Sequence, residues 1–194
     1  MLNFIKAIAL TIVIKISSPL GVFTSDANKF DPQNLDPIFK EKKMLTPLSQ
    51  EEIAIVLCKT HIDLYGAPPS KNKLALSWAQ IALENSRGKR IWNNNLGNQG
   101  PFRMNQRYYH HKFNGWPYRS FGSVDESAKS YWKIIKKCKM ADITFDRGDP
   151  VQSARSLKGC NYYSSDLKEY SKVLSSLYYE AQKKIIPKIN CGQN

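Results

Sequence analysis

The spacing of apolar and polar residues along the chain predicts helices for most of its length. In residues 71–84, KNKLALSWAQIALE, apolar side chains recur at intervals of three or four, which places them on one face of a helix. Ser70 supplies a polar cap before this helix, and Gly88 is a typical terminator after it. The expected buried face is formed by Leu74, Trp78, Ile81 and Ala82.

Other segments carry helix signals of different kinds. Ser49 and Ser123 are each followed three residues later by glutamate, which is the capping-box pattern that opens a helix. Asp149 and Pro150 form a cap followed by proline at the first helical position, and they predict a short helix that ends at Gly159. The last predicted helix, near residues 166–185, has an apolar stripe of Leu167, Tyr170, Val173, Leu174 and Leu177.

Residues 93–121 break the helical pattern. This segment is rich in aromatic residues, as in RYYHHKFNGWPYRSF, and Asn114-Gly115 lies between two aromatic runs. An Asn-Gly pair in that position is typical of a β-hairpin. The pattern therefore predicts a mainly α (α+β) domain with one small β-hairpin lobe.

The first 27 residues have the features of a secretory signal peptide. Lys6 precedes an apolar stretch, and Ser25-Asp26-Ala27 has the small-x-small form of a cleavage site. An uncleaved anchor is the alternative, but Lys15 interrupts the apolar run and leaves it shorter than the ~18 residues that a membrane span needs. We therefore expect a secreted or periplasmic protein with no transmembrane anchor.

The rest of the chain divides into three parts. Prolines discourage regular structure in residues 28–48, which we expect to be a linker. The predicted domain spans residues 49–186, and residues 187–194 form a C-terminal tail. We expect the protein to be a monomer.

All four cysteines lie beyond the predicted cleavage site. An even number of cysteines in a secreted chain indicates disulfides, although buried free thiols are an alternative. Of the three possible pairings we favour Cys138–Cys160, which closes the shorter loop and leaves Cys58 to pair with Cys191. No C-x-x-C pair is present and histidines are few, so we expect neither a metal site nor a cofactor.

The chain has a strong excess of basic residues. Lys and Arg number 29 against 16 acidic residues, which gives a formal charge of +13. Removal of residues 1–27, which contain two lysines and one aspartate, leaves +12. Such a charge favours an anionic partner, either nucleic acid, acidic lipid or an anionic glycan.

Four stretches occur together in one order: ALSWAQIALENSRGK, NNNLGN, YRSFGSVDESAKSYWKII and RGDPVQSARSLKGCNYYSSDLKEYSKVLSSL. In this order they resemble the lysozyme-like glucosaminidases of peptidoglycan, near glycoside hydrolase family 73, across roughly residues 72–180. The resemblance implies a lysozyme-like helical domain. One departure is Asn85, which stands where the family usually has serine after the glutamate.

The resemblance implies that Glu84 is the general acid. Cleavage of a glycosidic bond needs a proton for the leaving oxygen, and a carboxyl can supply it near neutral pH only if its pKa is raised. Partial negative charge at a helix C-terminus and nearby apolar groups act in that direction. A solvated surface glutamate is the alternative for an isolated residue of this kind.

No second catalytic carboxylate is evident. The resemblance indicates instead a tyrosine in NYYSSD, with Tyr163 as the better match and Tyr162 beside it; core packing is the alternative for both. It also implies that Asn94, Asn95 and Gly97 shape the floor of a sugar-binding site. Trp116 on the predicted hairpin is a candidate stacking platform for a sugar ring, and ordinary packing is again the alternative.

The sequence thus predicts a secreted hydrolase of the β-1,4 glycosidic bonds in peptidoglycan glycan strands. It would be an N-acetylglucosaminidase or a lysozyme-type muramidase, and deacetylated glycan is one candidate substrate. The missing second carboxylate favours an alternative, a non-catalytic module that binds glycan on the same fold. A binder of nucleic acid or anionic lipid ranks last, because no nucleic-acid motif accompanies the charge.

Overall fold

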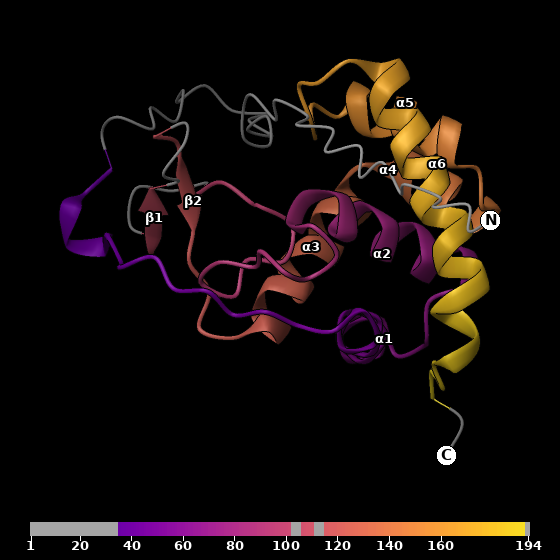
Figure 1. The fold of residues 1–194 in the computed structure, drawn as a ribbon, viewed down its shortest axis with the longest axis horizontal. Helices are drawn as coiled ribbons and strands as arrows, with labels where there is room; N and C mark the ends of the chain where they lie inside the picture. The colour runs from indigo at the N-terminus through magenta and orange to yellow at the C-terminus, as the bar shows by residue number, and fades with distance from the viewer. Residues whose placement is uncertain (1–34, 102–105, 111–114, 193–194) are drawn as a thin grey trace, which may run out of the picture.

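The computed structural model describes residues 35–101, 106–110 and 115–192 (Figure 1). Its helices are α1 (Gln50–Tyr65), α2 (Lys71–Asn85), α3 (Val124–Lys137), α4 (Lys139–Arg147), α5 (Pro150–Gly159) and α6 (Leu167–Lys184). Two short 3-10 helices, η2 (Pro37–Phe39) and η3 (Ile186–Lys188), flank them, and the strands are β1 (Tyr108–His110) and β2 (Pro117–Arg119). The helical part and the hairpin lie at opposite ends of the molecule (Figure 1).

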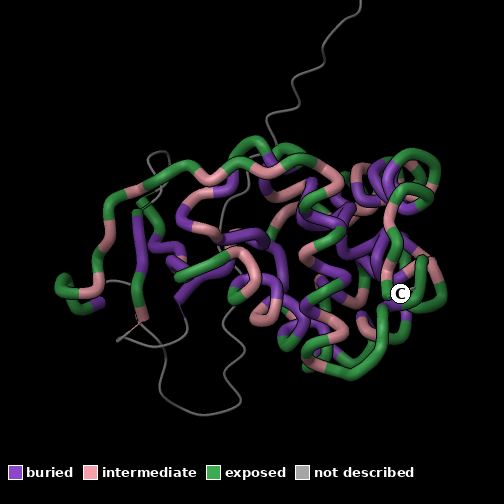
Figure 2. The backbone as a smooth tube through the Cα atoms, turned by 90° about the horizontal axis from the view of Figure 1, so that it is seen from below, coloured by how far each residue is buried: buried purple, intermediate pink, exposed green. Residues whose placement is uncertain are grey.

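Helix α2 is the central element of the helical part. It packs against α1, α4 and most extensively against α6. Every residue from 73 to 82 is buried, so α2 is enclosed on all sides rather than on the one face that its periodicity predicts. The buried residues gather in the interior of this helical part (Figure 2). Because α2 is enclosed on all sides, the last residues of this helix are held in a fixed position by the packing around it.

Helix starts match their sequence signals, while helix ends match them less well. Ser49 forms the full capping box with Glu52, and Asp149 caps α5. The expectation that the second helix ends at Gly88 is wrong, because α2 ends at Asn85 and Ser86 takes a left-handed conformation with φ of 55°. Helix α4 was not predicted, since no side chain caps its start at Cys138.

The predicted hairpin is present as an antiparallel pair, β1 and β2. Tyr109 lies opposite Tyr118, and their stacked rings lie 5.9 Å apart. Gly115, at the turn, has φ of 67°, whereas Asn114 lies outside the described residues. The hairpin thus forms a small lobe beside the helices (Figure 1).

The chain immediately before α1 lies along the domain; we call residues 39–48 the strap. Its backbone is hydrogen-bonded to β1 through Glu41 and to the segment after α2 through Thr46 and Leu48. Leu48 donates to the carbonyl of Gly88. A Cβ at Gly88 would collide with the Leu48 carbonyl oxygen, so glycine is required where the strap crosses the end of α2.

Two disulfides join elements that are distant in sequence. Cys58 of α1 is bonded to Cys191 in the tail, and Cys138 at the end of α3 is bonded to Cys160 after α5. This is the pairing favoured from the sequence. Within the residues that the structure describes, no helix is both long and apolar enough to cross a membrane.

We expect the two disulfides to contribute unequally to stability. In the loop-entropy account, a cross-link across 133 residues stabilises by about 5 kcal/mol and one across 22 residues by about 3 kcal/mol. The double variant C58A/C191A should therefore lose more free energy of unfolding than C138A/C160A, as measured in urea titrations. Equal losses would contradict this order.

Candidate active site

Glu84 is the penultimate residue of α2, and its carboxyl is held among buried groups. The residue is only partly exposed. Burial raises the pKa of Glu84 to about 7, while a hydrogen bond from Asn98 acts in the opposite direction. Near neutral pH the carboxyl therefore exists in both protonated and ionised forms, as a proton donor requires.

The residue after Glu84 fastens the end of α2 to the following loop. Asn85 is fully buried. Its amide donates to the Leu96 carbonyl at 2.9 Å, and its side-chain oxygen accepts from the Gly88 amide at 2.7 Å. Asn85 therefore hydrogen-bonds the backbone on both sides of the loop that follows α2. A serine side chain is shorter and could not make these bonds in the same way.

Residues 93–99, which we call the amide loop, fold back over the helix end. Asn98 has φ of 48°, and its side-chain nitrogen lies 2.6 Å from the Glu84 carbonyl oxygen and 3.4 Å from Oε2 of the same residue. Gly97 is buried beside the tyrosines: a Cβ there would lie 3.3 Å from the Tyr162 hydroxyl. The loop thus brings a donor and a small residue to the carboxyl.

Three phenols from separate elements lie near enough to Glu84 for its charge to raise their pKa values. Burial raises the pKa of Tyr131 and Tyr162, and of Tyr170, and the negative charge of Glu84 raises each further. All three phenols therefore stay neutral at physiological pH. The Tyr162 hydroxyl is buried and has no hydrogen-bond partner among the described residues.

Tyr163 faces a different part of the molecule. Its hydroxyl donates to the Ala154 carbonyl at 3.0 Å, and its ring stacks on that of Tyr170 with centroids 3.6 Å apart. Burial, with a contribution from the charge of Asp166, raises its pKa to about 12. The structure thus brings Tyr162, and not the hydroxyl of Tyr163, into the environment of Glu84.

The other acidic residues considered from the sequence make contacts elsewhere. Asp125 pairs with Lys59, while Asp142 and Asp146 both pair with Lys73. The remaining three, Glu126, Asp149 and Asp166, accept hydrogen bonds from backbone amides at helix starts. Among the described residues, no second carboxylate influences the pKa of Glu84.

Most of the asparagine row is directed away from Glu84. Asn95 is fully buried, and its amide bonds the carbonyls of Gln99 and Arg119. Asn94 donates to the Phe121 carbonyl, and Asn93 bonds the strap at Lys42 and Met44. Asn95 therefore serves the architecture of the loop, and Asn98 is the residue of this loop that contacts Glu84.

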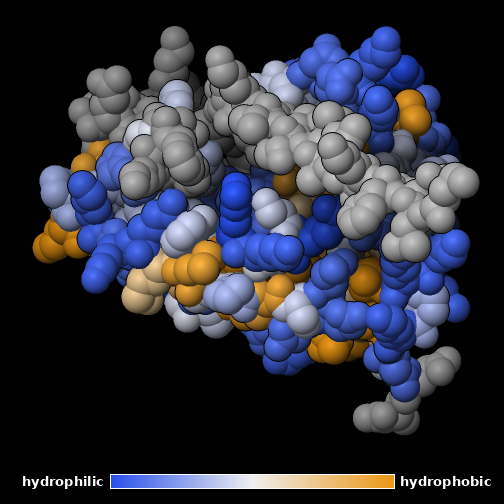
Figure 3. Space-filling view, viewed as in Figure 1, coloured by the Kyte–Doolittle hydropathy of each residue, from blue (hydrophilic) through white to orange (hydrophobic). Residues whose placement is uncertain are grey.

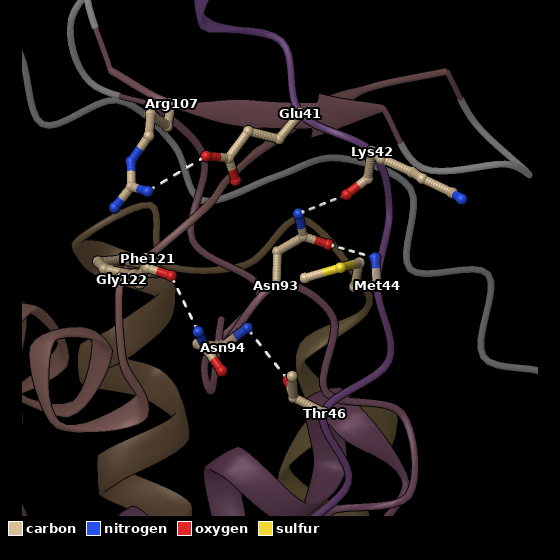
Figure 4. Close-up of a pocket in the computed structure, with 9 residues that line it drawn as sticks. All are labelled: Glu41, Lys42, Met44, Thr46, Asn93, Asn94, Arg107, Phe121 and Gly122. Carbon is tan, nitrogen blue, oxygen red and sulfur yellow. Dashed lines mark hydrogen bonds and ion pairs between the residues drawn. The ribbon is translucent and has the colours of Figure 1, made fainter.

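A hollow of roughly 390 Å³ lies on the strap side of the amide loop (Figure 4). Asn93 and Asn94 line one wall, and the pair of Arg107 and Glu41, 3.2 Å apart, lines another. Glu84 does not line it. Trp116 is 38% exposed beside β2, and its role in stacking on a sugar stays a prediction.

The sequence analysis did not single out Tyr131 or Tyr170 as site residues. Tyr131 belongs to α3 and bonds Gln80 of α2 at 2.6 Å. Tyr170 was assigned to the apolar stripe of α6, where it is indeed buried. The signal that could have found them is a hydroxyl on an otherwise apolar helix face, because a buried phenol needs a polar neighbour.

Comparison with known proteins adds one structural relative. No protein-family model and no curated protein matches the chain. The chain is similar to the crystal structure of a peptidoglycan hydrolase mutant from Sphingomonas sp. A1, with a TM-score of 0.50 and 16% sequence identity, across 66% of this chain and 90% of that chain. The predicted fold class, a mainly α, lysozyme-like domain with a small β-hairpin lobe, is confirmed.

No group of His, Cys, Asp and Glu that could hold a metal ion occurs in the described parts of the chain.

The raised pKa of Glu84 predicts a pH-dependent cost to stability. The folded protein binds this proton up to about pH 7, whereas the unfolded chain releases it near 4.5, so the free energy of unfolding falls as pH rises between these values. Replacing Glu84 by Gln removes the titration and should raise the free energy of unfolding at pH 8, relative to its effect at pH 4, by about 3 kcal/mol.

Urea unfolding of the wild type and E84Q at both pH values measures this difference. E169Q, at an exposed glutamate of α6, is the control and should change little. A parallel pH dependence of wild type and E84Q would contradict the burial of the carboxyl.

Proposed function

We propose that the protein hydrolyses the glycan strands of peptidoglycan, with Glu84 as the general acid. The observation that carries the proposal is a partly exposed carboxyl with a pKa of about 7 at the end of a buried helix, on the fold of a peptidoglycan hydrolase. Near neutral pH such a carboxyl can give its proton to the leaving oxygen as the glycosidic bond breaks.

The surroundings of Glu84 suit this reaction. The neutral phenol of Tyr162 can orient a water molecule or the substrate, and its buried hydroxyl needs a polar partner. Because the hydroxyl of Tyr163 is already bonded to Ala154, we assign this task to Tyr162. The bond cut is a β-1,4 linkage, as in an N-acetylglucosaminidase or a lysozyme-type muramidase, and deacetylated glycan stays a candidate substrate.

The charge of the protein supports an anionic polymer as the target. The sequence carries +13 in total and +12 without residues 1–27. The coloured residues in Figure 3 are mostly hydrophilic, with a hydrophobic band across the lower middle of the view. Such a charge raises the local concentration of an enzyme on an anionic wall. The disulfides suit a secreted or envelope protein.

Replacing Glu84 by Gln should abolish glycan cleavage, because the amide cannot supply the proton. We expect the clearing of isolated sacculi to fall by at least about a hundredfold. In the wild type, activity should be high below pH 7 and lost as pH rises through it, since the reactive form is the protonated one. Equal clearing by both proteins would reject Glu84 as the acid.

A non-catalytic glycan-binding module is the second candidate, because no other carboxylate among the described residues acts on Glu84. Measurement of reducing ends separates the two. Binding to sacculi without new reducing ends in the wild type would favour the binding module.

The two adjacent tyrosines offer a matched test. Tyr162→Phe removes the unpartnered hydroxyl and should lower kcat by about 10- to 100-fold with little loss of stability. Tyr163→Phe keeps the stacked ring and should leave kcat within about twofold, while it costs about 1 kcal/mol of folding free energy through the lost bond to Ala154. The reverse pattern would reassign the role to Tyr163.

A further inference from the structure

Asn98 contacts Glu84 at two points. Its side-chain nitrogen lies 2.6 Å from the backbone carbonyl oxygen of Glu84 and 3.4 Å from carboxylate Oε2. The carbonyl is one of the last in α2, and such carbonyls have no partner within the helix. The Asn98 side-chain amide therefore donates a hydrogen bond to a carbonyl at the end of α2 and also reaches the Glu84 carboxyl.

The backbone of Asn98 makes this reach possible. Its φ of 48° belongs to the left-handed region, which asparagine adopts more readily than most residues. The preceding Gly97 is buried beside Tyr162 and Tyr131, and a Cβ there would lie 3.3 Å from the Tyr162 hydroxyl. The left-handed backbone of Asn98 directs its side chain back at the end of α2.

Neighbouring asparagines show that this contact is specific to position 98. Asn93 also has a left-handed backbone, with φ of 48°. Its amide, however, donates to the Lys42 carbonyl and to Ser120 Oγ, and its oxygen accepts from Met44. The same loop thus contains a second asparagine with the same φ that does not bond Glu84, and it serves as a matched control.

The groups that face Glu84 come from every element packed around it. Tyr131 belongs to α3, Tyr162 follows α5 and Tyr170 belongs to α6, and all three are neutral phenols. Among the described residues, neither a cation nor another carboxylate affects its titration. Burial favours the protonated carboxyl, and Asn98 is the group that favours the ionised form.

We propose that Asn98 is a positioning residue for Glu84, whose amide fixes the direction of the carboxyl and stabilises the carboxylate that remains after proton transfer. The proposal rests on the proposed function. In that step the C–O bond breaks, its electron pair goes to the leaving oxygen, and this oxygen takes the proton of Glu84. A water molecule forms the new bond to the anomeric carbon and releases a proton to the solvent. The negative charge left on Oε2 then faces the Asn98 N–H, so the hydrogen bond strengthens as the reaction proceeds.

Three variants test the proposal. Asn98→Gly removes the amide and keeps the left-handed backbone accessible, and Asn98→Asp adds an acceptor and a negative charge in place of the donor. Asn93→Gly is the control for loss of an asparagine with the same φ in this loop. The titration midpoint of Glu84 is followed by NMR of ¹³C-labelled glutamate carboxyls, with the Glu84 signal assigned from its absence in E84Q.

The midpoint should move to higher pH by about half to one pH unit in N98G and further in N98D, and it should stay at the wild-type value in N93G. On sacculi, kcat of N98G should fall about tenfold with little change in KM, and the alkaline limit of its activity should move upward with the midpoint. An unchanged midpoint in N98G would overturn the proposal even if activity fell.

The two proposals fail in different ways. If the wild type releases no reducing ends but the midpoint moves in N98G, the contact acts as described and the proposed hydrolase function is wrong. If the wild type cleaves glycan and the midpoint of N98G equals that of N93G, the hydrolase stands and Asn98 has no positioning role.

Discussion

The structure depends on how α2 ends inside the protein. A buried helix end leaves carbonyl groups without partners, and these must be satisfied by nearby donors. Here the side-chain amide of Asn98 bonds the Glu84 carbonyl, and the amide of Asn85 bonds the Leu96 carbonyl of the returning loop. These two bonds hold the amide loop against α2, so the geometry of the carboxyl follows from the way the helix is terminated.

The ionisation of Glu84 also depends on the contacts at the end of α2. Burial opposes ionisation of Glu84, and the only opposing effect identified among the described residues is one neutral amide. A cation in place of the amide would favour the ionised carboxyl, and a fully apolar contact would raise its pKa further. An amide donor is weak enough to leave both forms accessible near neutrality.

The sequence predicted the helices and the hairpin well, because caps and turns are local signals. Ser49, Asp149 and the aromatic runs around Gly115 each predict structure from a few adjacent residues. It predicted the disulfides from loop length alone. It gave no sign of α4, which starts without a side-chain cap, and none of the contacts of the strap, many of which are made by backbone groups.

The site was predictable only in part, for a physical reason. The order of the sequence motifs identified Glu84. The direction in which a side chain points, however, depends on packing partners that are distant in the sequence. Tyr162 and Tyr163 are adjacent and both buried, yet one faces the Glu84 carboxyl and the other the Ala154 carbonyl. The four asparagines of the amide loop likewise have different hydrogen-bond partners. Three of them have left-handed backbones, and their side chains point in different directions.

The bond between Cys138 and Cys160 lies two residues before Tyr162. It ties the segment that carries this phenol to the C-terminal end of α3, the same helix that contributes Tyr131. The segments that carry two of the phenols near Glu84 are therefore covalently linked. In an oxidising compartment this link restrains them before any ligand arrives, whereas reduction would return conformational entropy to the segment that carries Tyr162.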